Sequence, residues 1–224
     1  FMSRPYRPGT GGFSRASYTR APMAAALLVP VKDFRRAKLR LSPVLDEVAR
    51  MRLARSLATR VLDAADGLDA FVVCDDHEVR TWAEGQGAEV IWTPGRGLDG
   101  AVQMGVEHLS DRGITRAVVS HADLPLARAM PALADFPGVT LVPDRFGDGT
   151  NVACVPTGIG FRFAYGPGSF RRHADEARRQ ALPLRVVRDR RLSWDVDRPR
   201  DLTLPPDLAG DVPLPRPDPT AVHG

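Results

Sequence analysis

The sequence predicts a single α/β domain, built as a Rossmann-like, mostly parallel sheet with helices on both faces. Short apolar runs of strand length alternate along the chain with longer segments in which apolar residues recur at helical spacing. This alternation is typical of a sheet covered by helices on both sides. The chain has 224 residues, which is enough for one well-buried domain but leaves little room for a second.

The first strand and helix are predicted near the start of the domain. Residues 24–31 form an apolar run with a proline near its end, which predicts a buried strand followed by a loop. Ser42 followed by Pro43 predicts the start of a helix, with serine as the N-cap and proline in the first turn. Apolar residues then recur at helical spacing from Val48 to Ala65.

The rest of the chain continues the alternation. Further strands are predicted at 71–74, 89–92, 117–120, 139–142, 151–155 and 184–187. Further helices are predicted at 100–109, at 126–134 with a disturbance at Pro131, and at 169–180. Ligands bind at the carboxyl ends of the strands in such sheets, so the residues that follow each strand are the candidates for function. These are Lys32, Asp75, Asp123, the loop 147–151 and Asp195.

The two ends of the chain differ in composition from its middle. Residues 1–22 contain four arginines and no acidic residue, and without them 27 of the 31 basic residues remain against 27 acidic ones. The net charge of +4 therefore lies in this segment, and the rest of the chain does not predict a nucleic-acid partner. We expect residues 1–22 to be a disordered or added tail, 23–204 to be the domain and 205–224 to be a proline-rich tail.

Several features predict a cytoplasmic protein without a membrane partner. No apolar run is long enough to span a bilayer, and the polar, glycine-rich start does not resemble a signal peptide. Cys74 and Cys154 each lie in an apolar run, without Cys-x-x-Cys spacing. Buried strand thiols are therefore favoured over metal-binding or redox cysteines.

Three aspartates are the strongest candidates for chemistry. Asp123 follows a predicted strand, and Asp195 and Asp197 are spaced so that both carboxylates point to one side of an extended segment. Such oxygen ligands suit Mg²⁺ or Mn²⁺, which shares its coordination shell with substrate phosphates. Alternatively, Asp197 caps a helix that begins around Pro199, and Asp123 is only a turn residue. Because the aspartates follow separate predicted strands, we favour the metal site.

Basic and glycine-rich loops follow two of the strands. Lys32 and Lys38 lie just beyond the first strand, where cations would stabilise the charge on a leaving pyrophosphate, although the Gly-Lys-Ser/Thr ending of a P-loop is missing. Gly97, Leu98 and Asp99 run into a predicted helix. Their backbone amides could bind a phosphate, a base edge or a ribose, but a tight turn would explain the glycines as well.

Two later loops offer hydroxyl groups and backbone amides. Residues 144–151 contain Thr150, and residues 165–170 contain Gly166 and Ser169 at the start of a predicted helix. The start of a helix is a ready site for an anion. The structural alternatives are a hairpin turn for the first loop and a helix N-cap for the second.

Together these motifs resemble the 2-phospho-lactate guanylyltransferase family of deazaflavin coenzyme biosynthesis, which includes the phosphoenolpyruvate guanylyltransferases. The resemblance covers roughly residues 24–202 in the order of the family, and the Gly-Asp-Gly-Thr-Asn and Gly-Pro-Gly-Ser-Phe pair is the most specific part. The motifs are Val29-Pro30-Val31-Lys32, Ala37-Lys38 with Arg40-Leu41, Gly97-Leu98-Asp99, Ala122-Asp123-Leu124-Pro125, Pro143-Asp144-Arg145, Gly147-Asp148-Gly149-Thr150-Asn151, Gly166-Pro167-Gly168-Ser169-Phe170 with His173, and Asp195-Val196-Asp197.

The resemblance implies a single-domain nucleotidyltransferase, related to the molybdenum-cofactor guanylyltransferases, that joins GTP to a three-carbon phosphorylated acid. It implies that two divalent ions are held by Asp123, Asp195 and Asp197. It further implies that the acceptor acid is bound by Thr150, Gly166 and Ser169, that the nucleotide is bound by Lys32, Lys38, Gly97, Leu98 and Asp99, and that catalysis depends on Lys32, Lys38 and Asp123. The family more usually has asparagine at Asp99, where an aspartate could accept from a guanine N–H or a ribose hydroxyl.

The acceptor and the reaction class have alternatives. Phosphoenolpyruvate, 2-phospho-lactate and 3-phosphoglycerate differ by few atoms, and the arginine- and alanine-rich composition, typical of high-GC actinobacteria, favours phosphoenolpyruvate. Another acceptor would be a sugar phosphate or molybdopterin. A nucleotide-sugar glycosyltransferase also uses Asp-x-Asp, but normally after a mid-chain strand. A GTP sensor without turnover would not need the three aspartates. The sequence does not reveal the oligomeric state.

Overall fold

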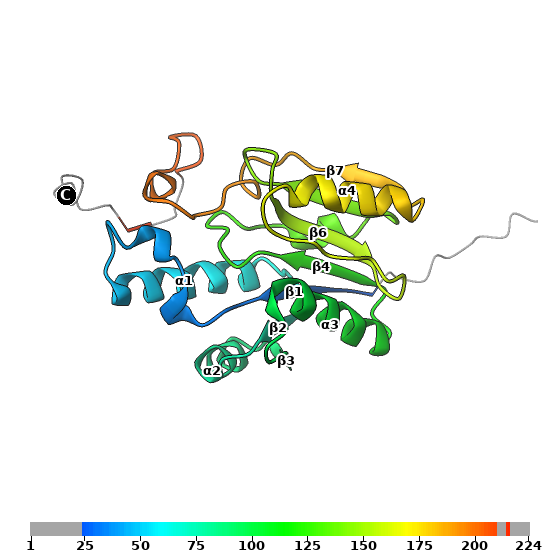
Figure 1. Cartoon of the computed structure of the whole chain (residues 1–224), viewed down its shortest axis with the longest axis horizontal. Helices are drawn as coiled ribbons and strands as arrows, with labels where there is room; N and C mark the ends of the chain where they lie inside the picture. The colour runs from blue at the N-terminus through cyan, green and yellow to red at the C-terminus, as the bar shows by residue number, and fades with distance from the viewer. Residues whose placement is uncertain (1–23, 210–213, 216–224) are drawn as a thin grey trace, which may run out of the picture.

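The computed structural model describes residues 24–209 and 214–215, and within them seven strands form one sheet (Figure 1). The strand order is β3-β2-β1-β4-β6-β5-β7, and β6 alone runs antiparallel to its neighbours. The predicted mostly parallel α/β sheet is therefore confirmed. The strands are β1 (Ala25–Pro30), β2 (Asp69–Cys74), β3 (Glu89–Trp92), β4 (Arg116–Ser120), β5 (Val139–Pro143), β6 (Thr150–Pro156) and β7 (Leu184–Val186).

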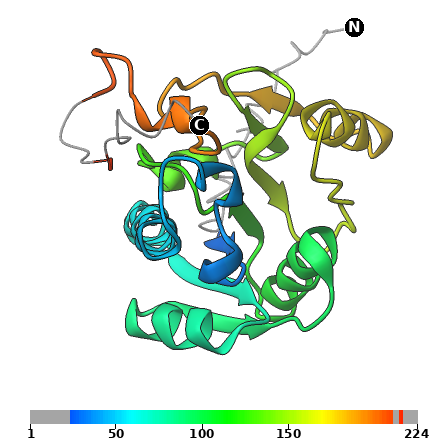
Figure 2. The same cartoon turned by 60° about the vertical axis from the view of Figure 1, so that its left-hand side comes forward.

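Helices pack on both faces of the sheet, as predicted (Figure 2). The helices α1 (Glu47–Asp63) and α2 (His77–Gly85) cover one face, and α3 (Gly97–Asp111) and α4 (Ser169–Arg179) cover the other. Leu27 packs with residues of α1 and α2, whereas the next residue, Leu28, packs with residues of α3. Because β1 is buried on both faces, its sequence is a continuous apolar run rather than an alternating one.

The prediction that Ser42 caps the first long helix is wrong. Residues Leu39–Leu41 form a short 3₁₀ helix, and Ser42 has a helical backbone at its end. The helix α1 begins four residues later, where Asp46 has an extended backbone and its carboxylate accepts a hydrogen bond from Ala49 N at 2.7 Å. An N-cap must leave the helical region while its side chain reaches the first turn, and Asp46 meets both conditions.

Two other helical segments differ from the prediction. The helix expected at 126–134 is only a 3₁₀ turn at Met130–Leu133, because Ala129 has a left-handed backbone with φ of 50° that interrupts any longer helix. The helix α2 was not predicted from the sequence. Its signal was present, since Asp76 caps the helix and Val79, Trp82 and Ala83 are buried at helical spacing.

Because β6 runs antiparallel to β4 and β5, the loop before β6 lies at the edge of the sheet where the parallel strands end. The first residue of β6, Thr150, lies at this edge, and the backbone N of His121, just after β4, bonds to the Asn151 carbonyl at 2.9 Å. The 144–149 loop and the end of β4 therefore lie together. The rule that ligands bind at carboxyl ends of strands applies here to the start of an antiparallel strand as well.

The predicted tails are mostly outside the described residues. Residues 1–22 and most of 205–224 fall there, so the structure does not test these two predictions. Residues 205–209 are described, and Leu208 is buried with 5% of its surface exposed. Within the described part of the chain, no helix combines the length and apolar character needed to cross a membrane.

Candidate active site

Two adjoining cavities open at the carboxyl edge of the sheet. The first, of about 700 Å³, lies beyond β1 and β2 next to the start of α3. The second, of about 980 Å³, lies between the end of β4, the 144–151 loop, the start of α4 and residues 195–201. The wall between them is lined from both sides by Lys32, Arg36, Lys38, Leu98, His121 and Asp123. Such an arrangement can hold two ligands with their reactive ends in contact.

The three predicted aspartates all line the second cavity, and Asp123 also belongs to the wall that the two cavities share. Asp123 follows β4, and its carbonyl accepts a hydrogen bond from Val196 N at 3.1 Å. Val196 is fully buried, so its two aspartate neighbours, Asp195 and Asp197, lie on either side of an anchored residue. The structure thus brings together residues that are more than seventy positions apart in the sequence.

Lys38 is the cation closest to these carboxylates. Its Nζ lies 2.6 Å from Asp123 Oδ2 and 3.3 Å from Asp197 Oδ1, and Arg40 Nη1 lies 3.2 Å from Asp197 Oδ2. Burial alone would lower the pKa of Lys38, but the two carboxylates outweigh burial and raise it above its usual value. Burial alone would raise the pKa of Asp123, and the ammonium of Lys38 outweighs it and lowers that pKa. Lys38 and Asp123 therefore form an ionised, partly buried pair.

The surroundings of Asp195 disfavour its ionisation. Burial, followed by the charges of Asp123 and Asp197, raises the pKa of Asp195 to about 6. Arg145 opposes this shift, with its Nη1 3.3 Å from Asp195 Oδ1. In addition, Asp123 Oδ1 is buried without a hydrogen-bond partner among the described residues. A carboxylate that resists ionisation and an orphaned carboxylate oxygen both indicate room for one more cation.

The donors suit a divalent ion by their chemistry, but they are not arranged as a finished metal site. Among residues 24–209 and 214–215, no group of three or more His, Cys, Asp or Glu side chains stands close enough to hold a metal. Instead, the Lys38 ammonium lies between Asp123 and Asp197 and neutralises both. The three predicted ligands therefore line one cavity, but the Lys38 ammonium binds a carboxylate oxygen of Asp123 and one of Asp197.

Asp201 and Arg145 also line the second cavity and bind the segment that carries Asp195 and Asp197. Asp201 Oδ2 accepts from Asp197 N at 2.9 Å and from Arg198 N at 2.6 Å, and its Oδ1 pairs with Arg145 Nη2. Asp201 therefore stabilises the start of the 3₁₀ helix Pro199–Leu202, and the alternative in which Asp197 caps that helix is wrong. The carboxylate of Asp197 faces Lys38 and Arg40 instead.

Neither Asp201 nor Arg145 was predicted from the sequence to be functional, and Arg145 was recognised only as part of the motif Pro143-Asp144-Arg145. Its guanidinium also lies over the rings of Phe146 and Trp194, at 4.7 and 4.4 Å from their centres. The available signal for Asp201 was its position two residues after Pro199, in the first turn of a predicted helix.

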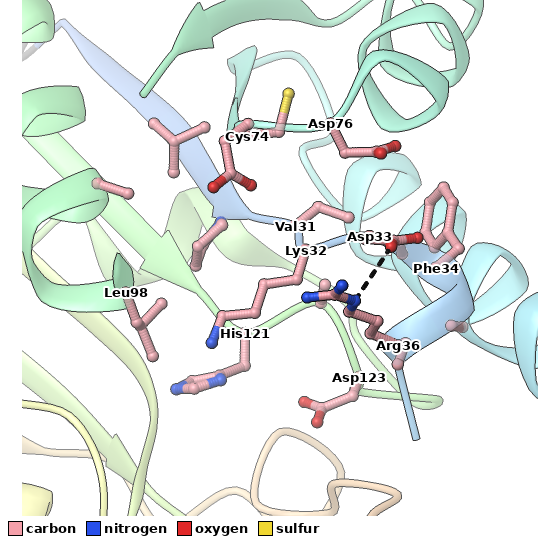
Figure 3. Close-up of a pocket in the computed structure, with 18 of the residues that line it drawn as sticks. Val31, Lys32, Asp33, Phe34, Arg36, Cys74, Asp76, Leu98, His121 and Asp123 are labelled. Atoms are coloured by element: carbon pink, nitrogen blue, oxygen red, sulfur yellow. Dashed lines mark ion pairs between the residues drawn. The ribbon is translucent and has the colours of Figure 1, made fainter. Parts of the chain in front are cut away.

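The residues predicted to bind a nucleotide mostly line the first cavity. Lys32 follows β1 and, within the described part of the chain, forms no ion pair. Lys32, His121 and Asp123 come from the ends of two strands and point into the cavity, with Leu98 on the opposite wall (Figure 3). Gly97, at the start of α3, also lines it and has φ of 64°, which a residue with a side chain rarely adopts.

Asp99 makes a different contact. It is not among the lining residues of either cavity, and its Oδ1 accepts a hydrogen bond from Tyr165 N at 2.8 Å. This bond joins the start of α3 to the loop that carries Gly166. An asparagine side-chain oxygen could accept the same bond, which explains how aspartate can stand at this position.

The two hydroxyl-bearing loops, residues 144–151 and 165–170, are joined to each other on one side of the second cavity. The carboxylate of Asp144 accepts from the backbone N of Phe146, Asp148 and Gly149 at 2.8–3.0 Å, which shapes the 144–149 loop. Asp148 Oδ2 then accepts from Gly168 N at 3.0 Å and joins the two loops. Thr150, Gly166 and Ser169 all line the second cavity. The residues that the resemblance assigns to the acceptor acid are thus grouped on one side of the aspartates.

Comparison with known proteins supports one family. The model of the family described as "Guanylyl transferase CofC like" matches residues 25–204. The phosphoenolpyruvate guanylyltransferase of Sphaerobacter thermophilus is 36% identical over 201 residues, which cover 86% of this chain and 96% of that protein. The 2-phospho-L-lactate guanylyltransferase of Methanocaldococcus jannaschii is 27% identical over 182 residues, covering 79% and 80%.

A solved structure supports the fold. A crystal structure provisionally described as a nucleotide-diphospho-sugar transferase, from Desulfovibrio desulfuricans G20, superposes with a TM-score of 0.66 and is 17% identical in sequence. The match covers 80% of this chain and 84% of that one. At this identity the similarity concerns the fold alone.

Proposed function

The chain belongs to the CofC-like guanylyl transferase family, and from this premise we propose that it transfers GMP from GTP to phosphoenolpyruvate with release of pyrophosphate. It is a transferase, and its relatives act as guanylyltransferases on phosphoenolpyruvate or 2-phospho-L-lactate. The observation that carries the proposal is the pair of adjoining cavities that share Lys32, Lys38 and Asp123 in their common wall. Two substrates bound on either side of a shared boundary are held close to one another, which favours reaction between them.

In this proposal GTP occupies the first cavity. Lys32 and Lys38 contact its phosphates, and Gly97 and Leu98 contact the nucleoside. Lys32 is suited to this task because its ammonium is not engaged by a carboxylate of the described residues. We propose that Asp99 acts mainly by holding the Tyr165 backbone, and its predicted contact with the nucleotide stays untested.

The acceptor acid occupies the second cavity, where it contacts Thr150, Gly166 and Ser169. Thr150 and Ser169 offer two hydroxyls that can donate to carboxylate and phosphate oxygens. The backbone N–H groups of Gly168, Ser169 and Phe170 already donate to Asp148 Oδ2, Gly166 O and Asp148 O, so the hydroxyls are the donors in this proposal. The choice of phosphoenolpyruvate over 2-phospho-L-lactate follows the more similar of the two relatives described above.

The chain's own residues align and neutralise the substrates. An oxygen of the acceptor phosphate attacks the α-phosphorus of GTP, one P–O bond forms, and the bond to the pyrophosphate oxygen breaks. Lys32 and Lys38 stabilise the negative charge that develops on pyrophosphate. Asp123, Asp195 and Asp197 would hold divalent ions, which we propose to be Mg²⁺, and these supply charge neutralisation between the approaching phosphates. The predicted number of two ions can be counted by titration with Mn²⁺.

We also propose that the protein works in the cytoplasm. Both of its cysteines, Cys74 and Cys154, are buried and unpaired, as expected for a chain kept in a reducing compartment.

The decisive experiment measures pyrophosphate release. Phosphoenolpyruvate, 2-phospho-L-lactate, 3-phosphoglycerate and a sugar phosphate are each offered with GTP or ATP, with and without Mg²⁺. We expect release with phosphoenolpyruvate and GTP that depends on Mg²⁺. Release with a sugar phosphate, and none with the three acids, would contradict the proposed acceptor.

The metal assignment is tested separately by Asp195→Asn. We expect turnover to fall by orders of magnitude, on the order of 100-fold or more, while the circular dichroism spectrum is unchanged. The matched control is Asp207→Asn, which changes an exposed carboxylate that pairs with Arg190 away from both cavities. Pyrophosphate release by Asp195→Asn at the rate of the control would rule out a metal-binding role.

A further inference from the structure

A buried histidine connects the two loops that form the proposed acceptor site. His173, on α4, is completely buried. Its Nε2 accepts a hydrogen bond from Ala164 N at 3.0 Å, and its Nδ1 lies 3.0 Å from Thr150 Oγ1. One ring therefore contacts both the threonine at the start of β6 and the loop that leads to Gly166.

These two contacts determine where the histidine carries its proton. A backbone N–H can only donate, so Nε2 must be the unprotonated nitrogen that accepts from Ala164. A neutral imidazole then carries its single proton on Nδ1. This proton faces Thr150 Oγ1, which must act as the acceptor in that bond.

The surroundings keep the ring neutral and fixed. Burial, followed by the charge of Arg172, lowers the pKa of His173 to about 4. The ring packs against Phe161, Phe163 and Tyr165, with centres 6.1, 5.9 and 5.0 Å away. A 180° flip of the ring would place Cε1–H against the Ala164 N–H and Cδ2–H against Thr150 Oγ1. Both hydrogen bonds would be lost, so a single orientation is favoured.

The consequence concerns the hydroxyl proton of Thr150. Since the oxygen accepts from His173, its own proton is free to point elsewhere, and Thr150 lines the second cavity. The neighbouring Ser169 is held in a similar way, because its Oγ accepts from Thr150 N at 3.0 Å. Both hydroxyls accept from the protein behind them and can donate toward a ligand.

We infer that His173 is a positioning residue that makes Thr150 a hydrogen-bond donor to an anionic oxygen of the acceptor acid. This inference rests on the proposed function, in which the acid occupies the second cavity. His173 does not contact the acid. It acts through the threonine hydroxyl, and it also holds Ala164, at the start of the loop that carries Gly166.

The first test is the tautomer of His173 in the intact protein. Long-range ¹H–¹⁵N correlation spectra distinguish a protonated Nδ1 from a protonated Nε2, and the signal is assigned by its loss in His173→Asn. We expect the Nδ1-protonated form at pH 7, with and without ligands. An Nε2-protonated ring would overturn the inference, because Thr150 would then have to donate to the histidine. This measurement needs no enzymatic activity.

The second test is a double-mutant cycle on the acceptor. Thr150→Val removes the hydroxyl at nearly constant shape, and His173→Leu removes its partner. We expect each variant to raise the KM for phosphoenolpyruvate about 10- to 100-fold, with a much smaller change in the KM for GTP. The double variant should raise this KM by much less than the product of the two single effects, because both changes remove the same donated bond. Any remaining difference from Thr150→Val reports the lost contact with Ala164 N. Additive effects would overturn the inference.

Two further variants separate positioning from general damage. His173→Asn keeps an amide that can donate to Thr150, so it should recover part of the affinity for the acid that His173→Leu loses. His77→Asn, at an exposed histidine on α2, serves as the matched control and should leave both KM values unchanged. If the wild-type enzyme releases no pyrophosphate with any acid, the proposed function fails, whereas the tautomer still decides the role of His173.

Discussion

Replacing Asp201 by asparagine should destabilise the protein strongly, although the side chain does not need to touch a substrate. Only 2% of the Asp201 side chain is exposed, and its partner Arg145 is 17% exposed. One carboxylate oxygen pairs with Arg145, and the other accepts from Asp197 N and Arg198 N. Asparagine has only one side-chain oxygen, so its NH₂ group must face either the guanidinium or two backbone N–H groups. Either orientation places donors against donors.

The expected size follows from the burial of the pair. Removing one partner of a buried ion pair costs about 3–5 kcal/mol. Arg145 keeps its contacts with the carbonyl and carboxylate of Asp195, so the lower end, about 3 kcal/mol, is expected here. For a domain of this size, such a loss lowers Tm by roughly 6–12 °C.

Urea unfolding followed by circular dichroism measures the effect. The matched control is Asp207→Asn, because Asp207 also pairs with an arginine, but the side chains of Asp207 and Arg190 are 54% and 68% exposed. An exposed pair contributes about 0–1 kcal/mol. If Asp201→Asn lies within 1 kcal/mol of Asp207→Asn, our account of the support behind Asp195 and Asp197 is wrong.

Three other predictions follow from the packing and charges. A Cβ on Gly105 would lie 2.7–2.9 Å from the Leu28 methyl groups and Val73 Cγ1, so Gly105→Ala should lower the free energy of unfolding in urea by about 1–3 kcal/mol. Gly85→Ala has open space around it and should not lower this free energy, so equal effects of the two substitutions would contradict the packing of α3. Because the pKa of His173 is about 4 when folded and near 6.5 when unfolded, the unfolded chain binds more protons between these values. Stability should therefore fall by about 3 kcal/mol as pH drops from 6.5 through 4, and His173→Leu should lack this component of the unfolding free energy. Lys38→Met should increase the affinity of the protein for Mn²⁺ in the absence of nucleotide, because the ammonium no longer neutralises Asp123 and Asp197. Calorimetry measures this affinity, and weaker binding by the variant would show that Lys38 does not compete with the ion.

Most of the fold could be predicted because its signals are local. The buried run of β1 and the apolar spacing of α1 depend on which residues are apolar and how far apart they are. Helix starts were less predictable, because both Ser42 and Asp46 are good capping residues and only the backbone at each position decides between them. The short α2 was missed, although its capping residue and buried positions can be recognised in retrospect.

Residues of the candidate site could be predicted where the sequence next to each residue was sufficient to identify it. Asp123, Asp195 and Thr150 were identified because each lies next to a predicted strand or in a motif. The partners of these residues were not predictable, because they depend on distances between distant segments. Nothing in the local sequence around Lys38 indicates that it pairs with Asp123, 85 positions later. The same holds for the bond between Asp99 and Tyr165, 66 positions apart.

Residue types and spacing alone thus indicate an α/β sheet with three aspartates and two hydroxyl-bearing loops near the ends of its strands, and the resemblance of its motifs implies a nucleotidyltransferase. The tertiary structure decides what those residues do to one another. Because β6 is antiparallel to β4, Thr150 lies at the edge of the sheet where β4 ends. Asp201 binds the backbone N of Asp197, and His173 forms hydrogen bonds with both Thr150 and Ala164. Hydrogen bonds and ion pairs extend only a few ångströms, so they exist only after packing has closed the distances that the chain leaves open.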